Sequence, residues 1–386
     1  MPATTATMKA LRFHGKQDIR LDDIPTPVCG KGQVKVKPKF VGICGTDLHE
    51  YMGGPSIIPT SPHPLTGEQV PLTLGHEFSA IVEEVGDDIT DMKPGDRVVV
   101  QPIIYDGTCG ACQEGLINCC YSNGFVGLSG WGGGLSEHVV LPRASVLHLP
   151  DNVRLEIGAL VEPIAVAWHA VNISPFKPGD SVLVLGGGPI GLAVLQALRA
   201  RGAGTVIVSE VAPRRKEFAK EFGATHVLDP TQDDIVARCK ELCDGVGPHV
   251  AFDAAGVQAG LTAGLHAIRA RGTLVNIAVW EKPASLFVND LVFREKHYMG
   301  VATYQAGDFQ AVIDALAEGE FGPFQARSAD DGRCANKGDY RSDLGKLVPD
   351  AMITRTIRLD EVESKGFKTL IEEKDKHVKI LVEVDV

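Results

Sequence analysis

The sequence predicts a chain of the α/β plus β class, in which a β-rich domain is followed by a doubly wound parallel sheet. Three observations support this prediction. The chain has 386 residues, more than a single domain usually holds. Its first part alternates apolar and polar residues and is dense in glycine and proline, as in short strands joined by turns. From about residue 155 onward, helical stretches alternate with short β-branched strands, which is typical of a parallel sheet covered by helices.

The β-rich part consists of short segments with a period of two residues. This alternation predicts strands in residues 8–25, 33–42, 78–85 and 97–101. Turn signals lie between them, namely GGP at 53–55, KPGD at 93–96 and GWGGG at 130–134. Many short strands with such turns favour a β-barrel or a related β-rich domain.

The second part predicts helices and parallel strands in alternation. The expected strands are SVLVLG (181–186), TVIVSE (205–210), HVAFDAAG (249–256), GTLVNIAV (272–279) and MGVAT (299–303). Helices are expected at 155–171, 189–202 and 309–319. Residues 323–346 are polar and aperiodic, so we expect a surface loop or insertion there. A helix at 360–374 and a strand at 377–384 complete the prediction.

Composition excludes several classes of protein. The formal net charge of −11 argues against nucleic acid as the main partner, because phosphate binding needs a basic surface. No apolar stretch is long enough to span a bilayer, and the first residues do not have the pattern of a signal peptide, so we expect a cytoplasmic protein without a membrane partner. The chain has nine cysteines, and we expect no disulfides among them because a reducing compartment disfavours disulfide formation. Four of them lie within residues 109–120, which favours metal binding, whereas Cys239 and Cys243 are expected to be buried thiols.

A glycine-rich turn predicts the cofactor. Gly186, Gly188 and Gly191 follow an expected strand and open an expected helix, whose first residues are Pro189 and Ile190. Glu210 ends the next strand, about 20 residues further on, where dinucleotide-binding folds place the acid that contacts the ribose. The sequence therefore predicts an NAD site, with NADP disfavoured because Glu210 would repel a 2′-phosphate.

Four residues of the first part could bind a metal. Cys44, His76, Glu77 and Glu162 offer a thiolate, an imidazole and two carboxylates. Each also has an ordinary explanation, since a single cysteine in a strand is usually a core residue and Glu162 could simply stabilise a helix N-terminus. The sequence pattern alone does not bring these residues together in space.

The order and flanking residues of these motifs resemble the zinc-containing medium-chain dehydrogenase/reductase family, along nearly the whole chain. Within it, residues 54–79 and 125–142 are similar to the polyol and butanediol branch. The resemblance implies a GroES-like β-rich catalytic domain (1–158), an inserted Rossmann NAD-binding domain (159–322) and a C-terminal return to the catalytic domain (323–386). It also implies the interconversion of a secondary alcohol or vicinal diol and its ketone by an enzyme that uses zinc and NAD.

The resemblance assigns roles to individual residues. Cys44 and His76 match the ligands of the catalytic zinc, and Glu162 matches the third ligand position, with Glu77 as the alternative. Thr46 and His49 match the family's proton-relay positions. The chain departs from the family at Ala80, where glycine is usual.

A second zinc site is implied in the stretch DGTCGACQEGLINCC (106–120). The family carries four cysteines there. This chain offers Cys109, Cys112 and Cys120, with Asp106 at the position of the first cysteine. Four protein ligands with no open position would make this a structural zinc site. The alternatives are a lobe without metal, or a site that uses Cys119 in place of Cys120.

Other functions remain open on the sequence. A sorbitol or xylitol dehydrogenase would use the same metal chemistry, and Tyr51, Phe125 and Trp131 are the candidate pocket residues that would discriminate. A redox sensor that binds NAD without turnover would not need an open zinc position. A zinc-ribbon module for nucleic acid would need a basic lobe. The family likeness further implies a homodimer or homotetramer that acts on a small diol or hydroxyketone.

Overall fold

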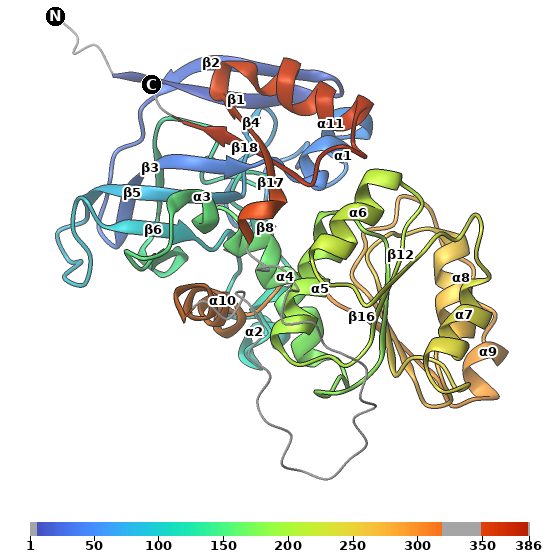
Figure 1. Ribbon diagram of the computed structural model, residues 1–386. Helices are drawn as coiled ribbons and strands as arrows, with labels where there is room; N and C mark the ends of the chain where they lie inside the picture. Colours follow the sequence, from blue (N-terminus) through green and yellow to red (C-terminus); the bar gives the residue numbers. More distant parts are fainter. Residues whose placement is uncertain (1–5, 319–348, 385–386) are drawn as a thin grey trace, which may run out of the picture. The chain divides into compact units, whose positions relative to one another are not determined.

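The computed structural model describes residues 6–318 and 349–384, so the loop predicted at 323–346 lies outside the described residues. The described chain divides into two compact units (Figure 1). The first comprises residues 6–166, 302–317 and 352–384; the second comprises residues 167–301, with 318 and 349–351. The first unit thus extends to residue 166, where the expected boundary was residue 158. It also includes residues 302–317, which were expected in the second domain.

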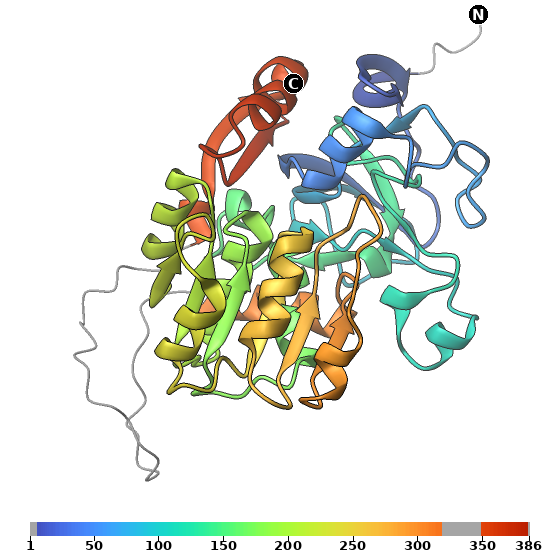
Figure 2. The ribbon, with the colours of Figure 1, turned by 90° about the vertical axis from the view of Figure 1, so that its right-hand side faces the viewer.

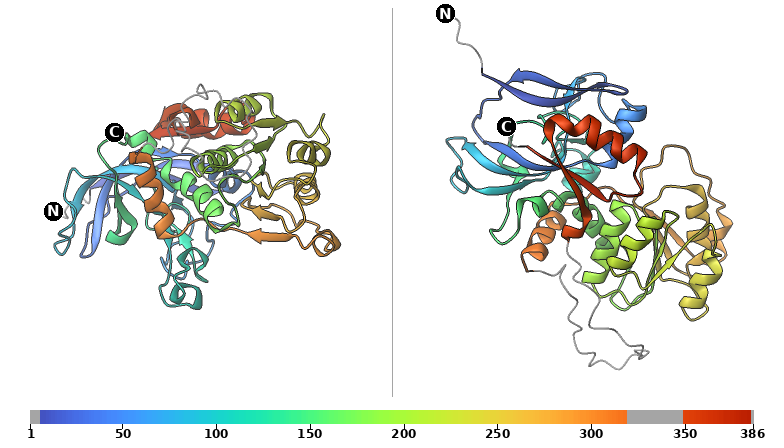
Figure 3. Two further views of the ribbon diagram at one scale, coloured as in Figure 1. Left: turned by 60° about the horizontal axis from the view of Figure 1, so that its bottom comes forward. Right: turned by 45° about the horizontal axis from the view of Figure 1, so that its top comes forward.

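The first unit is built around a mainly antiparallel sheet, in which the last two described strands of the chain pair in parallel with each other and a strand near residue 380 lies beside an early one. Figure 3 shows β18 (Lys379–Glu383) next to β3 (Gln33–Gly42), and Leu381 is paired with Gly42. The strand order is β10–β6–β5–β3–β18–β17. The other members are β10 (Val146–His148), β6 (Arg97–Val100), β5 (Glu77–Val85) and β17 (Ile353–Arg358), and β9 (Val139–Pro142) also pairs with β3. A second sheet holds β2 (Asp18–Pro25), β1 (Thr7–Gly15) and β4 (Leu72–Thr73).

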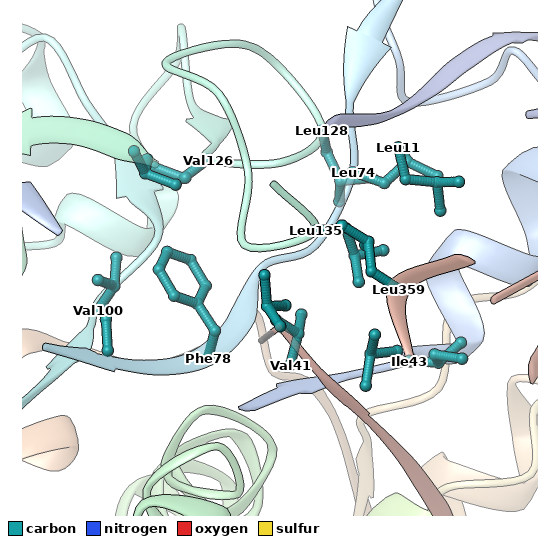
Figure 4. Packing of buried hydrophobic residues seen from close by; sticks show 14 of the residues in the cluster. Leu11, Val41, Ile43, Leu74, Phe78, Val100, Val126, Leu128, Leu135 and Leu359 are labelled. Carbon is teal, nitrogen blue, oxygen red and sulfur yellow. The ribbon is translucent and has the colours of Figure 1, made fainter. Parts of the chain in front are cut away.

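A closely packed apolar core holds the first unit together (Figure 4). Val41 on β3 and Phe78 on β5 are buried and point into it, and Leu359 from the C-terminal segment joins them. Burial of each such side chain contributes about 1.5–3 kcal/mol. Segments that lie hundreds of residues apart in the sequence therefore share one core.

The second unit is a parallel sheet of six strands with helices on both faces (Figure 2). The order is β13–β12–β11–β14–β15–β16, so the order in which the strands are added reverses between β11 and β14. The strands are β11 (Val182–Leu185), β12 (Val206–Ser209), β13 (His226–Leu228), β14 (Val250–Asp253), β15 (Thr273–Asn276) and β16 (His297–Gly300). Its helices include α5 (Pro189–Ala200), α6 (Pro213–Glu221), α7 (Ile235–Leu242), α8 (Gln258–Ala267) and α9 (Asn289–Val292). In such sheets ligands bind at the carboxyl ends of the strands where the order reverses.

Several elements differ from the sequence prediction. The strand expected at 299–303 is β16, two residues earlier, and β13 and β17 were not predicted. The helix expected at 360–374 consists of a 3₁₀ turn (Leu359–Glu361), a π-helix (Val362–Phe367) and α11 (Lys368–Glu372). The helix expected at 309–319 is α10, which spans Ala306–Glu318.

Among the described helices, none has the length and apolar character needed to cross a membrane.

Candidate active site and metal centres

Cys44 lies at the junction between a strand and a helix. β3 ends at Gly42, and Cys44 is the N-cap of α1 (Gly45–Gly53). The Oδ2 atom of Asp47 accepts a hydrogen bond from the backbone N–H of Cys44 at 2.9 Å, which fixes the start of the helix. Cys44 therefore lies at the N-terminal end of this helix.

His76 and Glu77 come from the chain that leads into β5. Their ligand atoms and the sulfur of Cys44 all lie within 4.8 Å of one another. The approach depends on Gly75, whose φ is 100° and at which a Cβ atom would lie 2.8 Å from the backbone nitrogen of Leu135. The structure thus brings together three of the four residues that the sequence singled out.

Asp47 orients His76. Its Oδ1 atom lies 3.6 Å from Nδ1 of the histidine, and both atoms are buried without a hydrogen-bond partner. Burial lowers the pKa of His76, but the Asp47 carboxylate and the Cys44 thiolate outweigh it, so that this pKa lies well above its usual value. Because Nδ1 faces Asp47, Nε2 is the nitrogen available to the cluster, as in the carboxylate–histidine–metal arrangement of many zinc sites.

Glu162 lies beside this group rather than within it. It occupies the first turn of α4 (Val161–Ile173), and its Oε1 accepts a hydrogen bond from the hydroxyl of Tyr304 at 3.0 Å. Burial, followed by the charge of Glu77, raises the pKa of Glu162 to about 7. His76, the hydroxyl of Tyr304 and Lys379 act in the opposite direction, but they do not outweigh the burial and the charge of Glu77.

Glu77 does have a cationic partner. The Nζ atom of Lys379 on β18 donates to its two oxygens at 2.8 and 2.7 Å, and both side chains are almost fully buried. Sequence reasoning missed Lys379, although a lysine within an apolar strand segment is a usable signal. It also missed Asp47, whose position three residues after Cys44 fits a capping box, and Tyr304, which has no local signal.

The relay candidates share one face of α1. The hydroxyl oxygen of Thr46 lies 3.7 Å from the sulfur of Cys44. His49 follows three residues later, so it lies on the same side of the helix, and it is partly exposed.

The donor set fits zinc. A thiolate, an imidazole and a carboxylate are the ligand types that Zn²⁺ takes in proteins, and three protein ligands leave one position open for catalysis. The unpaired Nδ1 of His76 and Oδ1 of Asp47 also indicate a cluster that is arranged around a charge rather than a set of ordinary core contacts.

The glycine-rich loop of the second unit has the geometry of a dinucleotide site. Gly186 has a φ of 96°, and Pro189 is the first residue of α5, so the helix N-terminus follows the turn directly. One oxygen of Glu210 accepts the backbone N–H of Gly187 at 2.6 Å, and the other accepts the backbone N–H groups of Val211 and Ala212. Glu210 is thereby fixed at the end of β12, next to the loop.

The cysteine lobe brings its four candidates together. Ligand atoms of Asp106, Cys109, Cys112 and Cys120 lie within 4.8 Å of one another. Oδ1 of Asp106 accepts the N–H groups of Cys109 at 2.7 Å and Thr108 at 2.6 Å, which holds the pKa of the carboxyl far below its usual value. Cys119 is exposed and is not a member of this group.

The three candidate pocket residues are packing residues of the first unit. The ring of Tyr51 is buried and meets that of Phe367 edge to face at 5.3 Å, while Phe125 and Trp131 pack against the apolar core. These contacts give no indication of which substrate is recognised.

A dinucleotide loop and a zinc-fitting cluster in one chain define a class, the zinc- and NAD-dependent alcohol dehydrogenases, which act on small molecules. Comparison with known families agrees. Residues 30–151 match the alcohol dehydrogenase GroES-like domain, and residues 189–318 match the zinc-binding dehydrogenase domain. The chain belongs to the zinc-binding dehydrogenase family.

Individual relatives cover nearly all of the chain. It is similar to the (R,R)-butanediol dehydrogenase of Bacillus subtilis, with 42% identity over 97% of this chain and 99% of that protein. A crystal structure of 2R,3R-butanediol dehydrogenase from Bacillus subtilis aligns with a TM-score of 0.86 and 41% identity, covering 98% of this chain and 100% of the other. The probable D-xylulose reductase A of Neosartorya fischeri is 33% identical over 83% of this chain and 89% of that protein.

Proposed function

We propose that this enzyme interconverts 2,3-butanediol and acetoin with NAD, and that it reduces acetoin or diacetyl in the reverse direction. The likeness to butanediol dehydrogenases along nearly the full length of the chain carries this proposal. In the oxidation, a secondary alcohol loses a hydride to NAD⁺ and a proton to the protein, and leaves as the ketone. A sorbitol- or xylitol-type polyol dehydrogenase is the alternative, which the xylulose reductase relative supports at lower identity.

We assign separate roles in the reaction to residues of the first unit. We propose Cys44, His76 and Glu162 as the ligands of the catalytic zinc, with Glu77 as the alternative ligand. When bound, zinc supplies a Lewis acid that polarises the carbon–oxygen bond of the substrate. Asp47 orients the ring of His76, and Tyr304 orients the carboxylate of Glu162. The hydroxyl proton is accepted at Oγ1 of Thr46, and His49 passes it to solvent through its imidazole nitrogens.

The loop of the second unit is the proposed site of NAD. Gly186 and Gly188 let the backbone approach the pyrophosphate, and the N-terminus of α5, which begins at Pro189, faces it with the N–H groups that follow the proline, the first of them on Ile190. The need for glycine at position 191 is supported by the 1.9 Å that would separate an added Cβ atom from the carbonyl oxygen of Gly186. The anchored carboxylate of Glu210 is suited to ribose hydroxyls and repels a 2′-phosphate. We therefore expect a large preference for NAD over NADP; equal turnover with the two cofactors would contradict the role of Glu210.

The cysteine lobe is the proposed structural zinc site, with Asp106, Cys109, Cys112 and Cys120 as its ligands. The convergence of four ligand atoms and the fixed carboxylate of Asp106 support this assignment. Four protein ligands leave no open position, so the ion would stabilise the lobe without taking part in the reaction.

We also propose a homodimer or homotetramer in the cytoplasm. β16 is an edge strand of the sheet, and exposed apolar side chains lie near it in the sequence, namely Phe287, Val288, Val292, Phe293 and Tyr298. An exposed strand edge beside apolar surface is typical of pairing with a second copy.

A substrate panel followed at the absorbance band of NADH tests the function. The panel holds the three 2,3-butanediol stereoisomers, acetoin, sorbitol, xylitol and ethanol. We expect the highest kcat/KM with a butanediol isomer and with acetoin in reverse. A clear preference for sorbitol or xylitol would assign the protein to the polyol dehydrogenases, and NAD binding without turnover of any substrate would indicate a sensor. The variant Cys44→Ser is the control, since it should lose catalytic zinc and nearly all turnover.

A further inference from the structure

Lys379 makes an arrangement of contacts that the reaction outlined above does not explain. Its ammonium group is buried and donates to both oxygens of Glu77 and, at 3.2 Å, to the backbone carbonyl of Ile43. Only 3% of the Lys379 side chain and 1% of the Glu77 side chain are exposed. A buried charge costs several kcal/mol unless it is paired, and here three acceptors meet the three N–H groups of one ammonium.

The backbone directs Glu77 toward this partner. Glu77 on β5 is paired across the sheet with Gly42 on β3, and Gly42 is in turn paired with Leu381 on β18. A Cβ atom at Gly42 would lie 2.1 Å from Oε2 of Glu77, so the carboxylate occupies the space that a side chain would otherwise fill. It lies against the backbone of β3, within hydrogen-bonding distance of the lysine that β18 supplies.

The other carboxylate of the cluster has a different environment. Glu162 accepts a hydrogen bond from the neutral hydroxyl of Tyr304. In the described parts of the chain, no lysine or arginine forms an ion pair with Glu162. Lys379 is therefore in direct contact with Glu77, whereas on Glu162 Lys379 and His76 act only through their charge, without forming an ion pair in the described part of the chain.

Although the Glu77 carboxylate lies within 4.8 Å of the ligand atoms of Cys44 and His76, we propose that Lys379 is a positioning residue that keeps this carboxylate paired with its ammonium, so that the zinc ion takes Glu162 as its ligand and keeps one position open. This inference rests on the proposed zinc site. The charges support it, because one thiolate and one carboxylate balance a divalent cation, and the Glu77–Lys379 pair adds no net charge. Without the lysine, Glu77 would carry an unbalanced charge beside the cation and would become a fourth protein ligand. Such a closed site is typical of structural zinc and not of catalytic zinc.

Cobalt substitution tests this inference apart from activity, because the visible absorption of Co²⁺ depends on its ligands and coordination number. We expect Lys379→Met to change the Co²⁺ spectrum and to lower kcat at least tenfold, with the KM for NAD unchanged. The double variant Glu77→Gln/Lys379→Met should regain the spectrum of the wild type, and Lys379→Arg should retain it. Glu77→Gln alone should leave the spectrum unchanged, because Glu77 is not a ligand.

The outcomes separate the two proposals. If Glu77→Gln alone gives the spectrum of a site that has lost a ligand, Glu77 is a ligand and the role of Lys379 is wrong. An unchanged spectrum in Lys379→Met, or one that the double variant does not restore, would also overturn it. If Lys379→Met fails to fold, Glu77→Gln still shows whether Glu77 is a ligand, and Lys379→Arg still shows whether another cation at this position keeps the spectrum of the wild type. A different result would contradict the proposed catalytic zinc site itself, namely wild-type protein that binds no Co²⁺ outside the cysteine lobe.

Discussion

Gly191 has almost no space for a side chain. A Cβ atom at this position would lie 1.9 Å from the carbonyl oxygen of Gly186, and because that atom belongs to the backbone it cannot rotate away. We expect Gly191→Ala to separate α5 from the turn and to abolish NADH binding, as measured by fluorescence titration. Gly307→Ala on α10, where the same atom meets open space, is the matched control and should bind NADH normally. Unchanged binding in Gly191→Ala would contradict the close packing of this loop.

A buried thiol makes stability depend on alkaline pH. Burial, followed by the charge of Cys243, raises the pKa of Cys239 from 9.0 to about 12. The unfolded chain therefore releases this proton at lower pH than the folded protein does. The contribution to the free energy of unfolding is complete below about pH 8.5 and is lost progressively as the pH rises toward 12.

Urea unfolding at several pH values checks this expectation. Cys239→Ala should show a shallower loss of stability between pH 9 and 11 than the wild type, after its pH-independent packing cost is subtracted. Cys119→Ala, at an exposed position, should follow the wild type. Parallel slopes for Cys239→Ala and the wild type would mean that this thiol does not contribute.

The site shows how much of the chemistry local sequence can reveal. Cys44, His76 and Glu77 stand in short motifs, and the structure brings them together. Lys379 could not be assigned, because its partner Glu77 lies 302 residues away and only the pairing of β18 with β3 brings them into contact. The contacts that distinguish Glu77 from Glu162, with Lys379 and with Tyr304, are likewise not encoded by any spacing within the motifs.

At the scale of elements, the lobe that contains α2 (Gly110–Gln113) is short and has little apolar core of its own, since Ala111 is the one buried residue of that helix. Its order is therefore expected to depend on a metal ion. The variant Asp106→Asn keeps an oxygen that can accept the N–H groups of Thr108 and Cys109 but removes the charge of the ligand. We expect zinc content to fall from about two ions per chain to about one.

Metal analysis after gel filtration, together with the melting temperature, checks this prediction. Turnover per remaining zinc should be preserved at low temperature, because the proposed catalytic ligands are untouched. Cys119→Ser is the matched control and should retain both ions. If Asp106→Asn keeps its full zinc content, the aspartate is not a ligand.

The predictability of an element follows from its burial. The strands β11, β12 and β14 are fully buried and mostly apolar, and such short apolar runs are easy to predict from the sequence. β16 is mostly exposed at the sheet edge, so its pattern is weak and the prediction was displaced by two residues. The C-terminal helix was predicted as a single α-helix because the same apolar spacing also suits the π-helix at Val362–Phe367.

At the scale of the whole molecule, the exposed edge of β16 predicts self-association. Val292 and Phe293 are 60% and 70% exposed, which is unusual for a pair of neighbouring apolar residues. We expect Val292→Glu to shift the protein toward monomers in light scattering, because it would bury a charge in the interface. Val28→Glu, on an exposed valine of the first unit, should leave the oligomer intact. A wild-type protein that is monomeric at micromolar concentration would contradict the prediction.

The pairing of β18 with β3 also has a consequence for biosynthesis. Glu77 and Lys379 are separated by 302 residues, so at about 5–20 residues per second the carboxylate leaves the ribosome roughly 15–60 s before its lysine. During that interval a nascent chain that captured zinc early could use Glu77 as a ligand. The ammonium reaches Glu77 only when β18 pairs with β3, so we expect the choice between the two carboxylates at the metal centre to be made after both segments have left the ribosome.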